Sequence, residues 1–278
     1  MDSVAIVGVG LIGGSFALAL RKAGYSGRIL GVSSPRTLER ALALSVIDKG
    51  ASLEDAAREA DLIYLAQPVH GIISTLPLLA QWVKPSTLIT DVGSTKKTIM
   101  DNAAVSLRPG QFLGGHPLAG KESRGVEAAD AELFSGRTYV LTPAASPKTP
   151  PVVEFVSWLE RIGAVPLWLE AREHDQTLAY TSHLPQLAST ALAVLLSEQG
   201  PNVNSIFGPA LLDSTRLALS PFEIWADILD TNGPQIDTAL DGYIQALQRL
   251  RMALGAPEMR ACFNDAAGFA RKLRTPHY

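Results

Sequence analysis

The sequence predicts an α/β fold in which a doubly wound, mostly parallel sheet is followed by an all-α C-terminal domain. Three observations support this prediction. From Val4 to about Leu169, short β-rich runs alternate with segments of helical period, which is the pattern of a sheet covered by helices. A glycine-rich turn joins the first strand to the first helix. Beyond Glu170 the β signal ends and long helical periodicities follow.

The strands predicted for the sheet are short and apolar. In open α/β sheets, ligands bind outside the carboxyl ends of the strands. The residues at or just after these ends are therefore candidates to line a site, and they are Gly8, Ser33, Gln67, Asp91 and His116. The predicted strands are Val4–Val9, Arg28–Val32, Leu62–Ala66, Thr87–Asp91, Phe112–Gly115, Thr138–Thr142 and Val165–Trp168.

We place a domain boundary after residue 169, so that residues 1–169 bind a dinucleotide and residues 170–278 form a helical domain. The Pro-rich stretch 143–151 is interpreted as a loop inside the first domain, because a helical run and a strand follow it. The helices predicted for the second domain are Glu173–Gln199, Pro221–Leu229, Ile236–Leu254 and Pro257–Arg274.

One stretch of the helical domain, Leu187–Leu196, is apolar nearly all round, which predicts burial on every side. Either an internal core or a subunit interface would bury it. The helical domain offers little internal area for this, which favours a homodimer formed through the helical domain.

Composition narrows the class of protein. An apolar fraction of 47% against 18% charged residues indicates a packed globular chain. A net charge of −3 without a basic block argues against nucleic acid as a partner. Cys262 is the only cysteine, so we expect no disulfide, no cysteine-based metal site and a core position for this side chain. Without a signal peptide or a long apolar run, we expect a cytoplasmic protein that does not enter a membrane.

The glycine-rich turn reads Gly-Val-Gly-Leu-Ile-Gly and lies between a predicted strand and a predicted helix. This context makes it a Rossmann-type dinucleotide fingerprint. Gly8 allows the tight turn, Gly10 lets the backbone approach a pyrophosphate, and Gly13 permits close packing of helix and strand. The amides of Leu11 and Ile12 begin the helix, where free N–H groups attract an anion. A glycine turn without a ligand would lose stability at three positions with no compensating gain.

The residues after the second strand favour NADP over NAD. An NAD site requires an acidic residue there to bind the ribose 2′-hydroxyl, and this chain has Ser33 instead. Ser34, Arg36 and Thr37 follow and supply hydroxyl groups and a guanidinium for a 2′-phosphate. The loop that starts with Gln67 and Pro68 is expected to pass under the cofactor, so both belong to the predicted cofactor site.

Two polar segments follow the predicted strands that would meet the reactive end of the cofactor. They are residues 91–97 (DVGSTKK) and residues 114–123 (GGHPLAGKES). His116 lies between a glycine pair and a proline. An imidazole titrates near neutral pH, which suits removal of a hydroxyl proton while hydride leaves. An isolated histidine is more often structural, but this position makes His116 the candidate base.

Motifs along nearly the whole chain resemble those of the prephenate/arogenate dehydrogenase family. They are GVGLIGGS, DVGSTK, GGHPLAG-x-E-S-x-G, SHLPQ and D-S-T-R-x-A-x-S-P-x-x-W. The resemblance implies a dehydrogenase that oxidatively decarboxylates a cyclohexadienol acid of tyrosine biosynthesis. It implies that His116 is the base or hydrogen-bond partner of the ring hydroxyl, and that Ser94 lies near both His116 and the nicotinamide.

The same resemblance implies a set of substrate-binding residues. His183 and Gln186 of the SHLPQ motif would help to bind substrate, and Arg216 would hold a substrate carboxylate with its planar fork. Asp213 would orient the loop around Arg216. Trp225 would either close the pocket or belong to the core. The run Pro209 to Asp213 departs from the family pattern and lacks an arginine there, which puts the shape of this loop in doubt.

The choice of substrate depends on one ammonium group. Arogenate carries an ammonium where prephenate has a keto oxygen, so an acidic side chain near the substrate tail favours arogenate. Glu122 is the candidate, although a solvated loop carboxylate or an ion pair with Lys121 or Arg124 is an equal alternative. NADP preference and a short chain resemble the arogenate-specific branch, while prephenate or use of both substrates stays open.

Two other classes of protein lack support in the motifs. A β-hydroxyacid dehydrogenase would carry a lysine in a Gly-x-x-x-Asn-Lys setting, and the chain has no such run. A regulator that binds NADP without turnover would leave His116 and Arg216 without a chemical role.

Overall fold

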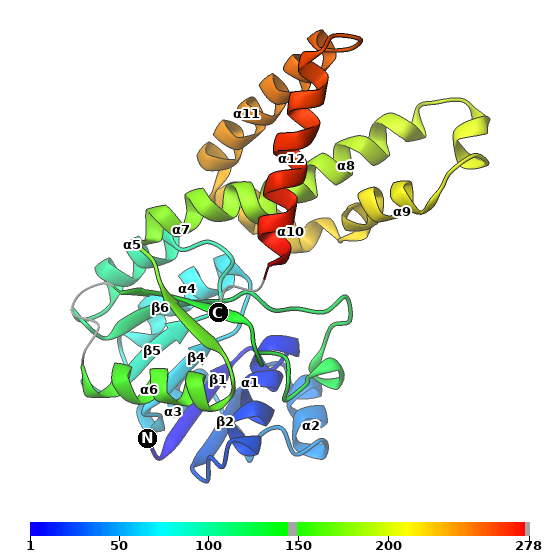
Figure 1. The fold of residues 1–278 in the computed structure, drawn as a ribbon. Helices are drawn as coiled ribbons and strands as arrows, with labels where there is room; N and C mark the ends of the chain where they lie inside the picture. The colour runs from blue at the N-terminus through cyan, green and yellow to red at the C-terminus, as the bar shows by residue number, and fades with distance from the viewer. Residues whose placement is uncertain (144–148, 276–278) are drawn as a thin grey trace.

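Eight strands form one sheet in the order β3-β2-β1-β4-β5-β6-β7-β8 in the computed structural model, which describes residues 1–143 and 149–275 (Figure 1). Neighbouring strands from β3 to β6 are parallel, β7 runs antiparallel to β6, and β8 is parallel to β7. The strands are β1 Ser3–Val7, β2 Arg28–Val32, β3 Lys49–Gly50, β4 Leu62–Leu65, β5 Leu88–Asp91, β6 Phe112–Pro117, β7 Thr138–Pro143 and β8 Val165–Trp168.

Helices pack on both faces of this sheet, so the doubly wound fold is confirmed. One core includes Phe16 of α1 and Phe155 of α6, and Phe16 stacks on Tyr64 with ring centroids 3.9 Å apart. The core on the opposite face includes Leu76 of α4 and Ile99 of α5. The helices of this domain are α1 Leu11–Lys22, α2 Pro35–Ala43, α3 Leu53–Glu59, α4 Val69–Leu79, α5 Lys97–Ser106, the 3-10 turn η1 Val126–Ala128 and α6 Pro150–Arg161.

The predicted strands are all present, with two differences. The two-residue strand β3 was not predicted, because Lys49 and Gly50 give no apolar pattern. Strand β6 continues past Gly115, so His116 lies inside the strand, opposite Val140 of β7. Within the predicted loop 143–151, residues 144–148 lie outside the described residues, while Pro143 ends β7 and α6 begins at Pro150.

The described residues that follow β8 are mainly helical, as predicted. Their elements are α7 Ala171–Leu178, the π-helical turn η2 Ala179–His183, α8 Leu184–Ser197, the 3-10 turn η3 Pro201–Asn204, α9 Pro209–Thr215, the 3-10 turn η4 Arg216–Leu219, α10 Phe222–Thr231, α11 Gly233–Met252 and α12 Glu258–Arg274. Residues 209–213, expected to form a loop, lie in the helix α9. A proline at its first position favours a helix start.

Helices α8, α9, α11 and α12 extend away from the sheet (Figure 1). In α8 only Gln186 and Ser189 are buried, and Val194 and Leu195 are more than half exposed. The alternative that an internal core of a single chain buries this helix is therefore wrong. Cys262 on α12 is also only partly buried, so its predicted core position is wrong. Both errors arise because this domain has few elements packed around its own centre.

Within the part of the chain that the structure describes, no helix combines the length and the apolar character needed to span a bilayer.

Candidate active site

Two adjoining pockets lie at the carboxyl edge of the sheet and share the glycine turn. The first, of about 410 Å³, is bounded by this turn, α2 and the segment around η1. The second, of about 450 Å³, shares Gly10, Gln67 and Pro68 with the first and extends past Ser94 to α10. Together the pockets form a cleft that suits an extended dinucleotide, with one end at α2 and the other near Ser94.

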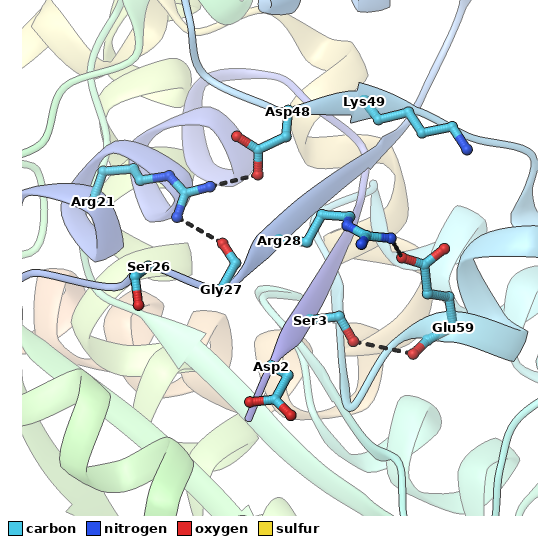
Figure 2. Close-up of a pocket in the computed structure, with 9 residues that line it drawn as sticks. All are labelled: Asp2, Ser3, Arg21, Ser26, Gly27, Arg28, Asp48, Lys49 and Glu59. Carbon is cyan, nitrogen blue, oxygen red and sulfur yellow. Dashed lines mark hydrogen bonds and ion pairs between the residues drawn. The ribbon is translucent and has the colours of Figure 1, made fainter.

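A larger pocket, of about 870 Å³, lies at the amino ends of β1 and β2 (Figure 2). Lys49 and Asp2 line it, and four further charged side chains form two ion pairs: Arg21 binds Asp48 and Arg28 binds Glu59. Arg21 also donates a hydrogen bond of 2.7 Å to the carbonyl oxygen of Gly27. These four charges are already paired, and the pocket is at the edge of the sheet opposite the glycine turn. For these two reasons this pocket is not the candidate dinucleotide site, although it is larger than the other two.

The glycines of the turn fit a bound dinucleotide for steric reasons. Gly8 has a φ of +97°, and a Cβ atom there would lie 2.4 Å from the carbonyl oxygen of Ala66. A Cβ atom on Gly13 would lie 2.2 Å from the carbonyl oxygen of Gly8. A Cβ atom on Gly10 would meet nothing within 4 Å, so this glycine leaves open space before α1. That space, beside the first N–H groups of α1, suits a pyrophosphate.

Most of the residues predicted for the adenosine end line the first pocket. Ser33, Arg36 and Thr37 are among them. Ser34 instead caps α2, since its hydroxyl accepts the Thr37 N–H at 3.3 Å. Sequence reasoning missed a further basic residue in this pocket, Arg40, which lies one helical turn after Arg36.

The second pocket is bounded on one side by the helical domain. Leu11, Ile12 and Ser94 line it together with residues of α10, among them Asp227. The Asp227 carboxylate accepts the backbone N–H of His70 at 2.9 Å, at the start of α4. This contact joins the two domains beside the cleft.

His116 is held by close packing of β6 against β5. A Cβ atom on Gly115 would lie 2.4 Å from the carbonyl oxygen of Asp91, and one on Gly114 would lie 2.7 Å from the sulfur of Met100. Larger residues would push β6 away, so the glycine pair before His116 sets the position of its backbone. The His116 side chain is partly buried.

A chain of hydrogen bonds orients the His116 imidazole. His116 Nδ1 lies 2.8 Å from Nε2 of His174, and His174 Nδ1 lies 2.7 Å from Oδ1 of Asp175. A carboxylate only accepts hydrogen bonds, so His174 carries its proton on Nδ1 and accepts with Nε2. His116 must then donate from Nδ1, which leaves its Nε2 unprotonated. This tautomer presents a lone pair to a substrate.

Asp175 also holds the start of α5. Its two carboxylate oxygens accept the backbone N–H groups of Lys96 and Lys97 at 2.7 and 2.8 Å. The Lys96 side chain is fully buried, binds Asp91 and donates a 2.7 Å hydrogen bond to the carbonyl oxygen of Gly115. Lys96 thus connects the end of β5 to the residue before His116.

Burial keeps the histidines of the site neutral. It is the main cause that lowers the pKa of His116 well below 6.5, and His174, Lys96 and His183 add to the effect. Burial also lowers the pKa of His174, against the influence of Asp175. It lowers the pKa of His183 to about 4. At neutral pH His116 can therefore accept a proton.

His183 belongs to the same cluster. Its side chain is 1% exposed, and its Nδ1 lies 3.3 Å from the amide nitrogen of Asn232, which also donates to the carbonyl oxygen of Asp175 at 2.9 Å. The ring of Trp225 meets His183 edge to face at 6.0 Å. His183 ends a π-helical turn, and Pro185 follows it at the start of α8. Because proline has no N–H, it cannot donate the backbone hydrogen bond that a regular α-helix would need there.

Comparison with known proteins identifies the group to which this arrangement belongs. Residues 16–167 match the model of the prephenate dehydrogenase nucleotide-binding domain, and residues 170–266 match that of the prephenate dehydrogenase dimerization domain. The chain belongs to the prephenate dehydrogenase family. It is thus an oxidoreductase, as the motifs predicted, in a family associated with tyrosine biosynthesis.

Several relatives of this family are similar over most of their length. A cyclohexadienyl dehydrogenase of Zymomonas mobilis is 32% identical, over 99% of this chain and 97% of that protein. A prephenate dehydrogenase of Bacillus subtilis is 34% identical, over 90% of this chain and 69% of that protein.

Solved structures of the family have the same fold. A prephenate dehydrogenase of A. aeolicus in complex with hydroxyphenyl propionate and NAD+ has a TM-score of 0.90 at 29% identity, covering 98% of both chains. A Synechocystis arogenate dehydrogenase has a TM-score of 0.86 at 28% identity, covering 98% of this chain and 99% of that one.

Some residues expected from the prephenate dehydrogenase motifs do not reach the pockets described above. Arg216 is exposed at the start of η4, and its guanidinium makes no ion pair with the described residues. Asp213 is exposed on α9, with no hydrogen bond to Arg216 within the described part of the chain. Glu122 is exposed, and its neighbour Lys121 binds Asp130 instead. Gln186 is buried and donates to the carbonyl oxygen of Leu217 at 2.8 Å, which positions η4.

The sequence reasoning missed His174, Asp175, Asn232 and Lys96. A signal existed for the first two, because adjacent His and Asp residues lie in the first helix of the second domain. On a helix, however, such polar residues usually form a solvated face. Their contacts with His116 and with α5 join residues 58 and 79 positions apart, which no local pattern encodes.

The low pKa of His183 predicts a loss of stability in acid. Between 6.5, its ordinary pKa, and about 4, the unfolded chain binds a proton at this site that the folded chain does not. The free energy of unfolding therefore falls as pH decreases through this range, by about 3 kcal/mol for this group. We expect His183→Gln to remove this part of the pH dependence. Urea unfolding at pH 7.5 and pH 4.5 measures it, and an equal loss in both proteins would contradict the assignment.

Proposed function

We propose that the chain is an NADP-preferring dehydrogenase that oxidatively decarboxylates arogenate to tyrosine, with His116 as the base. The observation that carries this proposal is the buried chain from Asp175 through His174 to His116, at the carboxyl edge of a dinucleotide fold. Ser94 follows the neighbouring strand and is proposed to contact both His116 and the nicotinamide. Residues 1–169 would form the cofactor domain and residues 170–278 the substrate and dimerisation domain.

The residues of the chain have a limited chemical task in this reaction. His116 Nε2 accepts the proton of the ring hydroxyl, while Nδ1–H keeps its hydrogen bond to His174. The charge that develops on His116 is stabilised by Asp175 through His174. A dinucleotide held by the glycine turn would supply the hydride acceptor for the hydroxyl-bearing carbon. The bond to the ring carboxylate then breaks, carbon dioxide leaves, and its electrons complete the aromatic ring, after which His116 can return the proton to the phenol oxygen.

Three further side chains are proposed for the substrate. His183 and Trp225 lie together in the helical domain, next to the His116 cluster. Both side chains would contact the ring of the substrate. Arg216 would bind a carboxylate, and since it is exposed in a single chain this role requires closure of the domains or contact with a second subunit. Asp213 and Gln186 would support η4.

Arogenate is proposed over prephenate because Glu122 lies in the loop after His116 and would attract its ammonium group. The similarity to the Synechocystis arogenate dehydrogenase supports this choice. A prephenate dehydrogenase and a cyclohexadienyl dehydrogenase are also similar to the chain, so prephenate, or use of both substrates, is the alternative.

The proposed reaction predicts that His116→Asn loses turnover but not cofactor binding. We expect kcat to fall by about 100-fold or more, because a positioned base contributes at least that factor.

His174→Gln should also lower kcat with little change in KM. In the unaltered enzyme, kcat/KM should decline only below pH 6.5, since the pKa of His116 is lowered. Formation of reduced cofactor with arogenate or prephenate, followed by absorbance, measures each.

Controls separate the alternatives. NADPH affinity, measured by fluorescence, should be unchanged in His116→Asn. Unaltered turnover in that variant would exclude His116 as the base. A chain that binds NADPH but turns over neither substrate would instead be a regulator.

The NADP preference predicts an effect at the end of β2. Ser33→Asp places a carboxylate where the 2′-phosphate would bind, so it should shift the ratio of kcat/KM values from NADP towards NAD by about tenfold or more. Ser26→Asp, at the opposite edge of the sheet, is the matched control. An unchanged ratio in Ser33→Asp would place the phosphate elsewhere.

A homodimer is proposed from the exposed apolar side chains of the helical domain. Helix α12 has no buried residue, and its large apolar side chains Phe263 and Phe269 are 71% and 64% exposed. On α11, Ile244 and Leu247 are 49% and 48% exposed. A monomer would expose this surface to water at a large cost, and a second copy can cover it.

The dimer predicts a mass in solution of twice the 29.6 kDa of one chain. Phe263→Asp should shift the protein to monomers at micromolar concentration, because it would bury a charge in the interface. Val105→Asp, a similar change at an exposed position of α5, should not. Light scattering after size exclusion measures both, and a monomeric unaltered protein would contradict the proposal.

A further inference from the structure

The pocket at the adenosine end contains an acidic side chain that the sequence did not place there. Glu127 of η1 lines this pocket together with Arg36 and Arg40 of α2. Its carboxylate accepts a hydrogen bond of 3.1 Å from Nε of Arg40, and these residues are 87 positions apart. The end of β2 lacks an acid, yet a carboxylate reaches the same pocket from the segment after β6.

Glu127 is held in this position by the packing of its own segment. The preceding Val126 is 3% exposed, and it lies near Gly14 of α1. The N–H of Asp130 donates to the hydroxyl of Ser15 at 2.9 Å. At Gly125 a Cβ atom would lie 2.9 Å from the Glu127 carboxylate, so this glycine leaves room for it. The acid is therefore part of the cofactor domain and not a side chain on a free loop.

Glu127 remains ionised at neutral pH. A hydrogen bond from its own backbone N–H, followed by the one from Arg40, lowers the pKa of this carboxyl below its usual value. A carboxylate repels a phosphate and accepts hydrogen bonds from a ribose hydroxyl. Unless Arg40 compensates its charge, Glu127 would oppose a 2′-phosphate and favour the free 2′-hydroxyl.

We propose that Arg40 is a ligand of the NADP 2′-phosphate that Glu127 holds in the absence of cofactor, and that Glu127 limits the discrimination against NAD. A phosphate monoester carries nearly two negative charges at neutral pH. It therefore competes with a single carboxylate for the guanidinium of Arg40. Arg36, one turn earlier on α2, would bind the same phosphate. This inference rests on the proposed NADP site and assigns it a second arginine and an opposing acid.

Cofactor binding tests this role without turnover. The full-length unaltered protein, Arg40→Ala and Glu127→Gln are titrated with NADPH and with NADH, and cofactor fluorescence gives the dissociation constants. We expect Arg40→Ala to weaken NADPH by about tenfold, as loss of one charged hydrogen bond implies, and NADH by less than about twofold. Glu127→Gln should tighten NADPH by about threefold or more and leave NADH equal or weaker.

Matched controls come from another exposed ion pair. Arg58 and Glu54 pair on α3 at 2.9 Å, away from the cofactor pockets. Arg58→Ala and Glu54→Gln should change neither dissociation constant. An NADPH to NADH ratio that is the same in Arg40→Ala and in the unaltered protein would overturn the role of Arg40. Weaker NADPH binding in Glu127→Gln would overturn the role of Glu127.

The same titrations separate this inference from the proposed cofactor preference. If the unaltered protein binds NADH more tightly than NADPH, the proposed preference for NADP is wrong. The shift of the ratio in Arg40→Ala and Glu127→Gln would still decide whether Arg40 binds the 2′-phosphate. A ratio that favours NADPH and is unmoved by Arg40→Ala would leave the preference intact and overturn only the inference.

Discussion

The carboxylate of Asp175 is the contact on which the rest of the site depends. It accepts two backbone N–H groups at the start of α5 and the Nδ1 proton of His174. These three donors come from both domains and are buried or partly buried, so each would cost free energy if left without an acceptor. One side chain thus positions the helical domain on the sheet and selects the tautomer of His174. The tautomer of His116 follows from that of His174.

The exclusion of water from this region gives the Asp175 contact its chemical effect. Buried side chains of both signs, Lys96 and Asp91, lie near His174, and Lys96 also lies near His116; burial lowers the pKa of both histidines. Such pairs add little net stability, because removing the charges from water is costly. They do connect the end of β5 to β6, because Lys96 binds Asp91 and the carbonyl oxygen of Gly115 at the same time. A neutral imidazole with a fixed lone pair is the result, and this suits a dehydrogenase whose cofactor supplies the redox chemistry.

The helical domain is built differently from the sheet domain. Its buried apolar cluster is small, with Ala179, Ile228, Ile236 and Ala239 at its centre. Ile236 and Ala239 come from the start of α11, whereas α12 contributes no buried residue, and both helices carry large exposed apolar side chains. This agrees with the match to a dimerization domain. The part of α10 that reaches the cofactor cleft is next to this cluster, so any change in its packing would reach the second pocket.

The sequence alone determined seven of the eight described strands, the glycine turn and the place of His116 near the carboxyl end of β6, because strand period, turn sterics and the glycine pair are local properties of the chain. It also indicated the helices of the second domain, but not which surface covers them. An apolar period such as that of α8 reports that burial is needed, not whether the same chain provides it. The tertiary structure alone brought Asp175 to α5, His174 to His116 and Glu127 to Arg40. These contacts join polar residues 58 to 87 positions apart, and each partner taken singly has the pattern of an ordinary solvated side chain.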